Sequence, residues 1–386
     1  MYYYVDHTSR FERNTGIQRC VRAIASGLIE AGVSLTPVVW NRSRLDLQRA
    51  SDQALDHLSR WHGPDADAWS EQGHEPWLLI VELVSGPSNP SAAQLRAAAD
   101  RHGLKLAWVF HDAIPLRWAS LYGAGARATA SHHATYMAGL AAADLVLANS
   151  HTTAQHLIAF LKQQHLPHGH VQALPLAEQF RGVQRIRPAI GTGTVHAPQR
   201  LLCVGSLEPR KNHRNLLKAV AWLCAQASFP AELVLVGWPN DPRVVSLVER
   251  VLQRDVPVRW EPDADDARLA ELYHWCDATV VASLEEGFGL PVAESLWFGK
   301  PCLTQDQGAL GELVRDGGCW PLQVQDWRQL AQGLAQWLGN PSLQRQVLVQ
   351  LRRRELRTWR DYAAELLSRL AGCHESSWRQ RLTPSP

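Results

Sequence analysis

The amino-acid sequence predicts an α/β protein of two Rossmann-like domains, each built on a mainly parallel sheet. Three observations lead to this fold class. Short apolar runs of strand length alternate with longer runs of helical period, which is typical of βα units. The alternation lapses once, over residues 179–198, and then restarts. The length of 386 residues suits two domains of roughly 150 residues or more each.

The first half of the chain is predicted to form an N-terminal domain over residues 1–180. Its strand-length apolar runs lie near residues 1–6, 33–40, 77–84, 104–110, 144–149 and 170–175. Apolar residues recur at close to the 3.6-residue period over residues 16–31, which predicts an amphipathic helix after the first strand. Residues 41–75 form a polar insertion that we expect to be partly helical.

A stretch rich in Gly, Pro and Arg, residues 181–198, is predicted to link the two domains. A C-terminal domain is expected over residues 199–355. Its predicted strands lie near 200–204, 232–236, 257–260, 278–283 and 301–304, and its helices near 212–226, 242–253, 266–275, 291–298, 326–338 and 341–371. Residues 356–386 are expected to hold a C-terminal helix that packs back toward the N-terminal domain, followed by a polar tail.

Composition and charge exclude several classes of protein. Apolar residues make up 46% and charged residues 20%, the profile of a globular protein with a proper core. The net charge of +2 gives no bulk field for nucleic acid. No apolar run reaches the length of about 18 residues that a membrane span needs, and the N-terminus has no signal-peptide layout. The seven cysteines are scattered singly, which predicts reduced thiols in a cytoplasmic protein.

The segment VVASLEEGFGLPVAESLWFGKPCLT, residues 280–304, has the order strand, glycine loop, helix, strand. Pro291 is placed to begin the helix, where its missing N–H costs nothing. The loop before it offers free backbone N–H groups at a helix N-terminus, those of Phe288, Gly289 and Leu290. Such a group of donors is well suited to an anion.

Two carboxylates accompany this loop, Glu286 within it and Glu294 in the predicted first helical turn. Together they could accept hydrogen bonds from vicinal hydroxyl groups. The alternative is that Glu294 only complements the helix dipole and that Glu286 is a solvated loop residue.

A second strand-loop-helix segment, LLCVGSLEPRKNHRNLL, covers residues 201–217. Arg210 and Lys211 stand just before the helix, with Asn212 as a candidate cap. A helix N-terminus with two cations makes a strong site for a diphosphate. A solvated basic turn is the alternative.

Two further candidates lie in the first half of the chain. His111 follows the apolar strand of LAWVFHDAIPL, and Gly16 opens the first helix with free N–H groups. His111, like Arg210, Lys211 and Glu286, falls at the carboxyl end of a predicted parallel strand, where open α/β sheets bind ligands. A satisfied polar histidine and a plain βα loop are the alternatives.

Two weaker signals are given little weight. Asp263 and Asp265 form a D-x-D string that could hold a metal, but Asp265 or Asp266 serves naturally as the N-cap of the following helix, so no metal ligands are expected. Several arginines could favour an anionic membrane surface or simply cover a solvated face, namely Arg19, Arg22, Arg42, Arg44 and Arg49.

These motifs resemble those of family-4 retaining glycosyltransferases of the GT-B fold. EEGFGLPVAE resembles the E-x7-E signature, and VGSLEPRKN resembles the donor-phosphate motif. HDAIP and NTGIQR are similar to N-domain motifs of bacterial mannosyl- and rhamnosyl-type transferases. The resemblance covers most of the chain and is strongest over residues 200–315. It implies two Rossmann-like domains that face a central cleft, with the active site between them.

The resemblance also implies roles for the C-terminal candidates. Glu294 should bind the donor ribose, and Glu286 the hydroxyls of the transferred sugar. The N–H groups of the loop Phe288-Gly289-Leu290 should hold the sugar and the diphosphate. Lys211, with Arg210, should neutralise the leaving diphosphate.

For the remaining candidates the resemblance gives less specific roles. His111 should lie near the anomeric centre and O6 of the sugar, and Gly16 near the phosphates and the acceptor. Many relatives carry Arg directly after the strand-ending glycine, whereas this chain has Ser206 after Gly205. Arg210 is the candidate to supply the missing cation.

The expected activity is retaining, metal-independent transfer of a mannose-like hexose, with GDP-mannose or a related GDP-sugar as donor and no cofactor besides this co-substrate. The expected acceptor is a glycan or polyprenyl-diphosphate-linked oligosaccharide in the synthesis of a surface polysaccharide such as O-antigen. Peripheral contact with the inner membrane would fit such an acceptor. An NAD-dependent oxidoreductase would need a glycine fingerprint that VDHTSRFERNTG does not supply. A non-catalytic nucleotide-sugar-binding protein remains the other alternative.

Overall fold

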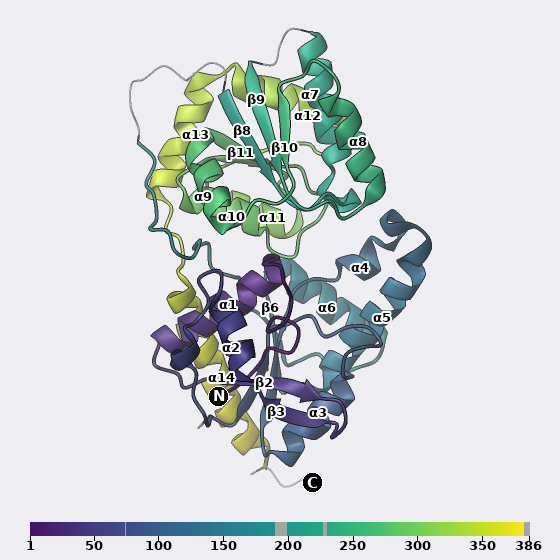
Figure 1. The fold of residues 1–386 in the computed structure, drawn as a ribbon, viewed down its shortest axis with the longest axis vertical. Helices are drawn as coiled ribbons and strands as arrows, with labels where there is room; N and C mark the ends of the chain where they lie inside the picture. The colour runs from purple at the N-terminus through teal and green to yellow at the C-terminus, as the bar shows by residue number, and fades with distance from the viewer. Residues whose placement is uncertain (74, 190–198, 227–229, 382–386) are drawn as a thin grey trace. The chain divides into compact units, whose positions relative to one another are not determined.

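The computed structural model describes residues 1–73, 75–189, 199–226 and 230–381, without the side chains of residues 124, 126 and 374–381. The chain divides into two compact units. The N-terminal unit comprises Met1–Ala177 and Arg357–Pro386, and the C-terminal unit comprises Glu178–Leu356. Each unit has one sheet with helices on both of its faces (Figure 1). The predicted α/β fold class with two Rossmann-like sheets is confirmed.

The sheet of the N-terminal unit has the strand order β3-β2-β1-β4-β5-β6-β7, with every pair parallel except β2 and β3. Its strands are β1 (Tyr2–Tyr4), β2 (Thr36–Asn41), β3 (Asp46–Arg49), β4 (Trp77–Ile80), β5 (Lys105–Phe110), β6 (Leu145–Ala148) and β7 (Val171–Ala173). Its α-helices are α1 (Gly16–Glu30), α2 (Asp52–Ser59), α3 (Ala92–Arg101), α4 (Ile114–Arg117), α5 (Ala126–Gly139), α6 (His151–Gln163) and α14 (Trp359–Arg381).

The sheet of the C-terminal unit is parallel throughout, in the order β10-β9-β8-β11-β12-β13. Its strands are β8 (Gln199–Val204), β9 (Ala231–Val236), β10 (Val258–Glu261), β11 (Ala278–Val281), β12 (Cys302–Thr304) and β13 (Cys319–Pro321). Its α-helices are α7 (His213–Ala225), α8 (Pro242–Leu252), α9 (Asp266–Trp275), α10 (Leu290–Trp297), α11 (Gly308–Arg315), α12 (Trp327–Leu338) and α13 (Pro341–Arg353).

Successive residues of the central strand β8 serve two separate cores in the C-terminal unit. Leu201 and Cys203 pack with residues of α7, α8 and α12 on one face. Leu202 packs with Phe180 and Tyr273 on the other face. Because side chains alternate along a strand, a parallel sheet covered on both faces needs nearly continuous apolar strands, as the sequence has here.

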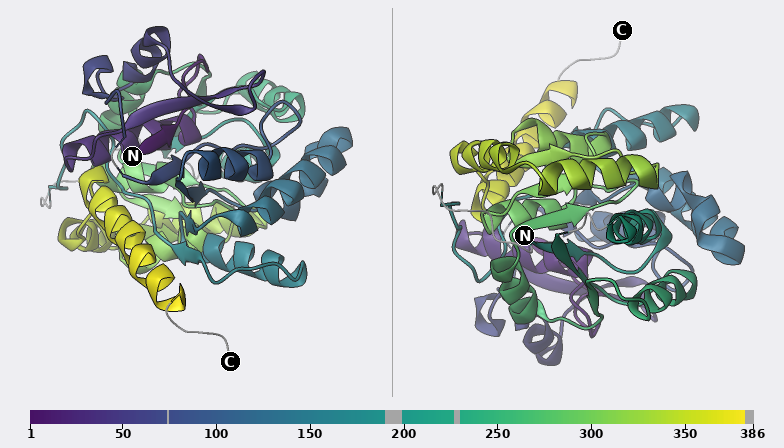
Figure 2. Two further views of the ribbon diagram at one scale, coloured as in Figure 1. Left: turned by 90° about the horizontal axis from the view of Figure 1, so that it is seen from below. Right: turned by 90° about the horizontal axis from the view of Figure 1, so that it is seen from above.

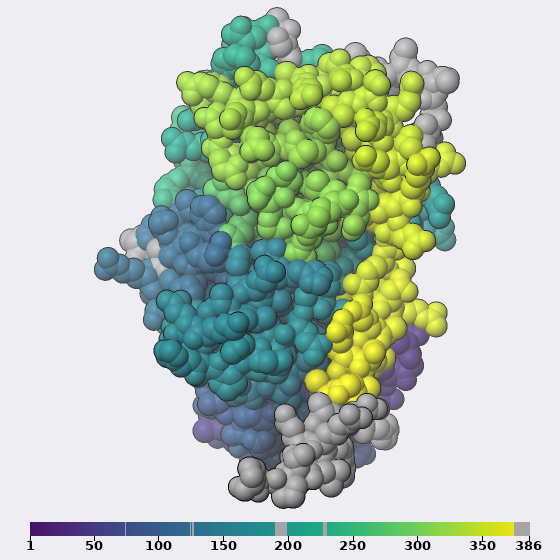
Figure 3. Space-filling view, turned by 180° about the vertical axis from the view of Figure 1, so that it is seen from behind, coloured from purple at the N-terminus to yellow at the C-terminus, as the bar shows by residue number. Residues whose placement is uncertain are grey.

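Helix α14 belongs to the N-terminal unit although it ends the chain. It packs on α1, where a side chain on Gly27 would collide with the backbone of Trp359, since an added Cβ would lie 2.3 Å from its carbonyl oxygen. Figures 2 and 3 show α14 in yellow along the surface of this unit. A small residue in α1 thus permits the close approach of the two helices.

Some elements differ from the sequence prediction. The expected helix over 341–371 is wrong, because α13 ends before Arg354, whose buried guanidinium binds the carbonyl oxygens of Leu313 and Gly317 at 2.5 and 2.8 Å. The sequence analysis also missed β3, α11 and β13. These elements are short, with four, eight and three residues, so each offers too few residues for a pattern to be recognised from the sequence alone.

The expected linker, residues 181–198, is described only as far as residue 189, and residues 190–198 lie outside the described part of the chain. The described part packs on the C-terminal unit. The indole N–H of Trp297 donates to the carbonyl of Val183, and the N–H of Ile186 donates to the carbonyl of Trp297, both at 2.9 Å. Residues 382–386 of the expected polar tail also lie outside the described residues.

Candidate functional site

The two motif-bearing turns of the C-terminal unit leave neighbouring strands. β8 and β11 pair directly, with β9 and β10 beyond β8 and with β12 and β13 beyond β11. The chain therefore reverses its winding direction between β8 and β11. Open α/β sheets bind ligands at such a switch point, outside the carboxyl ends of the strands.

Arg210 and Lys211 both bind Glu286 at this switch point. Nη1 of Arg210 lies 2.8 Å from Oε2 of Glu286, and Nζ of Lys211 lies 2.6 Å from Oε1. The hydroxyl of Ser283 donates to the same Oε1 at 2.6 Å. The backbone joins the two turns as well, since the N–H of Leu284 donates to the carbonyl of Arg210 at 2.8 Å. The structure thus brings together the turns 205–211 and 286–294, which the sequence analysis singled out separately.

Glu286 is a buried, ionised carboxylate. Burial alone favours its neutral form, but the charges of Lys211 and Arg210 outweigh that effect and hold its pKa at about 2. Arg210 also forms an ion pair with Glu208, with Nη2 2.9 Å from Oε1. Two cations are therefore matched by two carboxylates, and the turn does not carry the two uncompensated positive charges that the sequence suggests.

Asn212 occupies the N-cap position of α7, as expected, but its side chain does not cap the helix. It lies in the left-handed region with φ of 59°, and its side chain makes no capping bond. Its Nδ2 instead donates to the carbonyl oxygens of Ala282 and Val324 at 3.1 and 2.8 Å. Asn212 thereby fixes the basic turn to the loop that follows β11.

The start of α10 carries unused backbone donors. Among the described residues, the N–H groups of Phe288, Gly289 and Leu290 donate to no protein acceptor, and the helix has no side-chain cap. Gly289 has φ of 109°, and an added Cβ would lie 2.7 Å from Cδ2 of Leu310, so this position requires glycine. The loop thus presents free N–H groups at a helix N-terminus, an arrangement that is suited to an anion.

Glu294 lies one residue further into the helix than the sequence analysis expects, in the second turn rather than the first. Since α10 begins at Leu290, Glu294 opens the second turn. Its side chain is buried, and the hydroxyl of Tyr273 donates to its Oε2 at 2.9 Å. Tyr273, on α9, is a positioning residue that the sequence analysis missed, because only the packing of α9 against α10 brings it to Glu294.

Gly205 and Ser206 begin the basic turn. The side chain of Lys211 crosses Gly205 so closely that an added Cβ would lie 3.3 Å from Cδ of the lysine. Ser206 donates to Oε1 of Glu208 at 3.0 Å. Arg210, which also binds Glu208, is therefore the cation beside Ser206 in this turn.

The switch point of the N-terminal sheet lies between β1 and β4 and holds a different carboxylate. Glu82, two residues after β4, accepts the backbone N–H groups of His7 and Thr8 at 2.8 and 2.5 Å. Among the described residues no cation lies within ion-pair distance of it, and burial raises its pKa to about 7. No motif surrounds Glu82, so the sequence analysis did not find it.

His111 is buried at the end of β5, and its Nε2 lies 2.5 Å from the carbonyl oxygen of Val81. Because a carbonyl only accepts, Nε2 carries the proton and Nδ1 is left as an acceptor. Burial lowers the pKa of the imidazole, so His111 is neutral near pH 7. Val81 and Glu82 thus connect the strand that precedes them to both His111 and the loop after β1.

Gly16 is exposed and is the first residue of α1. The preceding Thr15 makes no capping bond to the helix, and its hydroxyl pairs with the side chain of Gln18. His111 and Gly16 belong to the N-terminal unit. The other candidates belong to the C-terminal unit, namely Glu286, Glu294, Arg210, Lys211 and the loop 287–290.

The D-x-D string has a structural role. Oδ1 of Asp265 accepts the N–H of Arg268 at 2.7 Å, which confirms Asp265 as the cap of α9. Within the described residues no group of three or more His, Cys, Asp or Glu side chains is arranged to hold a metal ion. No helix within the same residues is long and apolar enough to cross a membrane.

Solved structures share this two-sheet architecture. A sucrose-phosphate synthase from Thermosynechococcus elongatus aligns with 97% of this chain and 99% of its own, at a TM-score of 0.68 and 17% identity. Anabaena HepE in complex with UDP and glucose aligns with 96% of this chain and 99% of its own, at a TM-score of 0.63 and 14% identity. At such identities the likeness concerns the fold, which is the GT-B fold of glycosyltransferases.

A family model matches part of the chain. Residues 192–353, which contain both motif-bearing turns, match the model of the family "Glycosyl transferases group 1". The C-terminal unit is therefore similar to the group 1 glycosyltransferases.

Curated relatives include mannosyltransferases. O-antigen chain mannosyltransferase B from Escherichia coli is 34% identical over 155 residues, which is 35% of this chain and 40% of that protein. The serotype-specific mannosyltransferase WbdA from Escherichia coli is 25% identical over 86% of this chain and 40% of its own length. A D-inositol 3-phosphate glycosyltransferase from Thermobispora bispora is 30% identical over 52% of this chain and 49% of its own length. The matches span less than half of each of these relatives.

Proposed function

We propose that this chain transfers a mannose-like hexose from a nucleotide-diphosphate sugar to a glycan or lipid-linked acceptor, with retention of anomeric configuration and without a metal. One observation carries the proposal. Arg210, Lys211 and Glu286 meet at the switch point of the C-terminal sheet, beside the unused N–H groups at the start of α10. This arrangement suits a ligand that bears both a diphosphate and hydroxyl groups.

In the proposed reaction the bond between the anomeric carbon and the diphosphate oxygen breaks. Negative charge then grows on the leaving diphosphate, where Lys211, Arg210 and the N–H groups before Pro291 would stabilise it. The acceptor oxygen forms the new bond on the same face of the sugar, and its proton passes to the leaving phosphate. No divalent cation is required for this charge balance.

Because both cations already bind carboxylates, the proposal must explain how Lys211 can also bind the diphosphate. Nζ of Lys211 carries three protons, and it donates one to Glu286. A diphosphate can therefore share Lys211 with Glu286 rather than replace it. Glu286, whose pKa of about 2 keeps it ionised, then remains in place to accept hydrogen bonds from the sugar hydroxyls.

The proposal also gives roles to the remaining candidates. Glu294, held by Tyr273, would accept the ribose hydroxyls of the donor. The neutral imidazole of His111 would accept a sugar hydroxyl through Nδ1. Gly16, with the uncapped start of α1, would bind near the phosphates and the acceptor.

The mannose-like donor is proposed from the curated relatives, which include two mannosyltransferases of Escherichia coli. GDP-mannose is the donor we favour, and an O-antigen or related surface polysaccharide is the product. A polyprenyl-diphosphate-linked acceptor would place the chain at the inner face of a membrane during assembly.

A donor panel tests the proposal. The purified chain is incubated with GDP-, UDP- and dTDP-sugars without acceptor, with and without EDTA, and release of nucleoside diphosphate is measured. We expect slow hydrolysis of one donor, GDP-mannose foremost, that EDTA leaves unchanged. Binding of a donor with no hydrolysis and no transfer would favour a non-catalytic binding protein, and loss of activity in EDTA would overturn the metal-free mechanism.

A further inference from the structure

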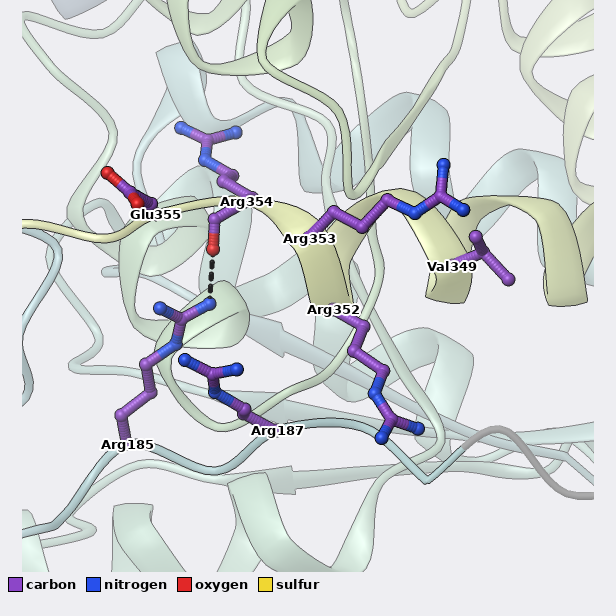
Figure 4. A pocket seen from close by; sticks show the side chains of 7 residues that line it. All are labelled: Arg185, Arg187, Val349, Arg352, Arg353, Arg354 and Glu355. Carbon is purple, nitrogen blue, oxygen red and sulfur yellow. Dashed lines mark hydrogen bonds between the residues drawn. The ribbon is translucent and has the colours of Figure 1, made fainter.

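A strongly basic pocket lies in the C-terminal unit, apart from the turns described above. It is a pocket of about 600 Å³ lined by Arg185, Arg187, Val349, Arg352, Arg353, Arg354 and Glu355 (Figure 4). Five of these seven residues are arginines. None of them belongs to the turns that carry Arg210, Lys211 and Glu286, so the proposed donor site does not account for this pocket.

Two of the arginines build the wall of the pocket. Arg354 is buried and donates to the carbonyl oxygens of Leu313 and Gly317, with Glu178 3.4 Å from its Nη2. Arg185 donates from Nη2 to the carbonyl oxygen of Arg354 at 2.5 Å, as Figure 4 shows. These bonds anchor the segment that precedes β8 to the end of α13.

The other three arginines are exposed and uncompensated. Among the described residues, Arg187, Arg352 and Arg353 have no carboxylate within 4.0 Å, and Glu355 is the one acidic residue of the lining. Burial and the neighbouring charge of Arg187 lower the pKa of Arg185, which is the direction expected where like charges crowd together. A bound anion would relieve this repulsion.

Interaction with a helix dipole explains only part of the cluster. Arg352 and Arg353 lie in the last turn of α13, where cations are favourable. Arg185 and Arg187 come from a different segment, and their side chains extend toward the end of α13 (Figure 4). Arginines from two segments thus line one hollow, which indicates a site rather than a solvated helix end.

We propose that this pocket binds a ligand with clustered phosphate groups. One guanidinium group can donate two parallel hydrogen bonds to two oxygens of a phosphate, and it stays charged at all physiological pH values. A volume of about 600 Å³ falls within the range of small-ligand sites and exceeds the size of a single phosphate. A free diphosphate and a phosphorylated lipid headgroup share this chemistry, and the test separates them.

The first arm of the test uses pyrophosphate. Calorimetric titration compares the full chain, the Arg187→Gln/Arg352→Gln variant, and an Arg315→Gln/Arg345→Gln control. Arg315 and Arg345 are exposed residues of the same unit that lie outside the pocket, so the control matches the loss of charge. We expect the pocket variant to lose one binding equivalent, or to bind it at least tenfold more weakly, while the control binds like the wild type. Any pyrophosphate bound at the proposed donor site remains in all three proteins and does not affect this difference.

The second arm uses vesicles of phosphatidylcholine with and without phosphatidic acid, in a flotation assay. If the pocket variant alone loses flotation with phosphatidic acid while pyrophosphate binding is equal in all proteins, the ligand is a lipid headgroup. If the pocket variant and the control behave alike in both arms, the pocket is not a phosphate site and the inference is overturned.

Discussion

The two sheets of the molecule each place a glutamate at the switch point, and the two environments are opposite. Glu286 binds Lys211 and Arg210, and its pKa is lowered to about 2. Glu82 is also buried, but it accepts the backbone N–H groups of His7 and Thr8 and has no cation within ion-pair distance among the described residues, and burial raises its pKa to about 7. A glutamate at the switch point of a parallel sheet is therefore held ionised in one unit and has its neutral form favoured in the other.

This difference indicates that the two switch points are suited to bind different chemical groups. The C-terminal switch point combines cations, free N–H groups and a permanent carboxylate, which suits a charged and hydroxylated donor. The N-terminal switch point holds its loop through Glu82 and presents the neutral His111 nearby, through Val81. Because no cation lies within ion-pair distance of Glu82 among the described residues, this carboxylate is better suited to hydroxyl groups than to phosphates.

The largest effect that we expect is on donor turnover, when Lys211 at the C-terminal switch point is replaced. We expect Lys211→Ala to reduce donor turnover about 10²- to 10³-fold, because it removes a charge aimed at the leaving diphosphate. The control is Lys218→Ala, an exposed lysine on α7. Turnover and thermal unfolding are measured for both variants, and similar turnover in the two would refute the role of Lys211.

Replacing Glu286 by Gln should destabilise the chain by roughly 3 kcal/mol, because the largely buried Lys211 loses its carboxylate partner while Arg210 keeps only its ion pair with Glu208 of the two that it forms. Since the pKa of Glu286 is lowered in the folded state, its stabilising effect is complete above the unfolded pKa and is lost only as pH falls toward about 2. The loss in Glu286→Gln should therefore be constant from pH 5 to 8. The free energy of unfolding is measured in urea at each pH. The control variant is Glu271→Gln, which removes only an exposed ion pair on α9.

Glu82→Gln should show the opposite dependence on pH. The raised pKa means that wild-type stability is greatest below the unfolded pKa and declines as pH rises toward about 7, by on the order of 3 kcal/mol. The glutamine variant lacks this decline, so its deficit relative to the wild type should shrink between pH 5 and 8. The free energy of unfolding is measured in urea for both proteins across this range. If it changes with pH by the same amount in the two proteins, Glu82 does not have the raised pKa.

The smallest expected effect concerns Tyr273. Tyr273→Phe removes the hydroxyl that positions Glu294, and we expect the donor KM to rise about threefold to tenfold with kcat little changed. Tyr362→Phe is the matched control, since its buried hydroxyl has no partner among the described residues. Equal kinetics for the two variants would remove Tyr273 from the donor site.

The order of apolar, polar, glycine and proline residues along the sequence was sufficient to predict most of the fold and part of the site. Strands such as β8 and β11 are apolar runs because both of their faces are buried, and the loop before Pro291 shows its helix start directly in the sequence. The pairing of Arg210 with Glu286 could not be predicted, because it depends on β8 lying beside β11. Glu82 lay beyond prediction for a similar reason, since its partners His7 and Thr8 are distant in sequence.

The central claim is that the switch point of the C-terminal sheet binds the donor diphosphate. A crystal structure of the chain with the nucleoside diphosphate of its donor tests this most directly. We expect phosphate oxygens within hydrogen-bonding distance of Nζ of Lys211 and of the N–H groups of Gly289 and Leu290, with Glu286 still beside Lys211. A diphosphate bound elsewhere, with these donors unchanged, would contradict the account.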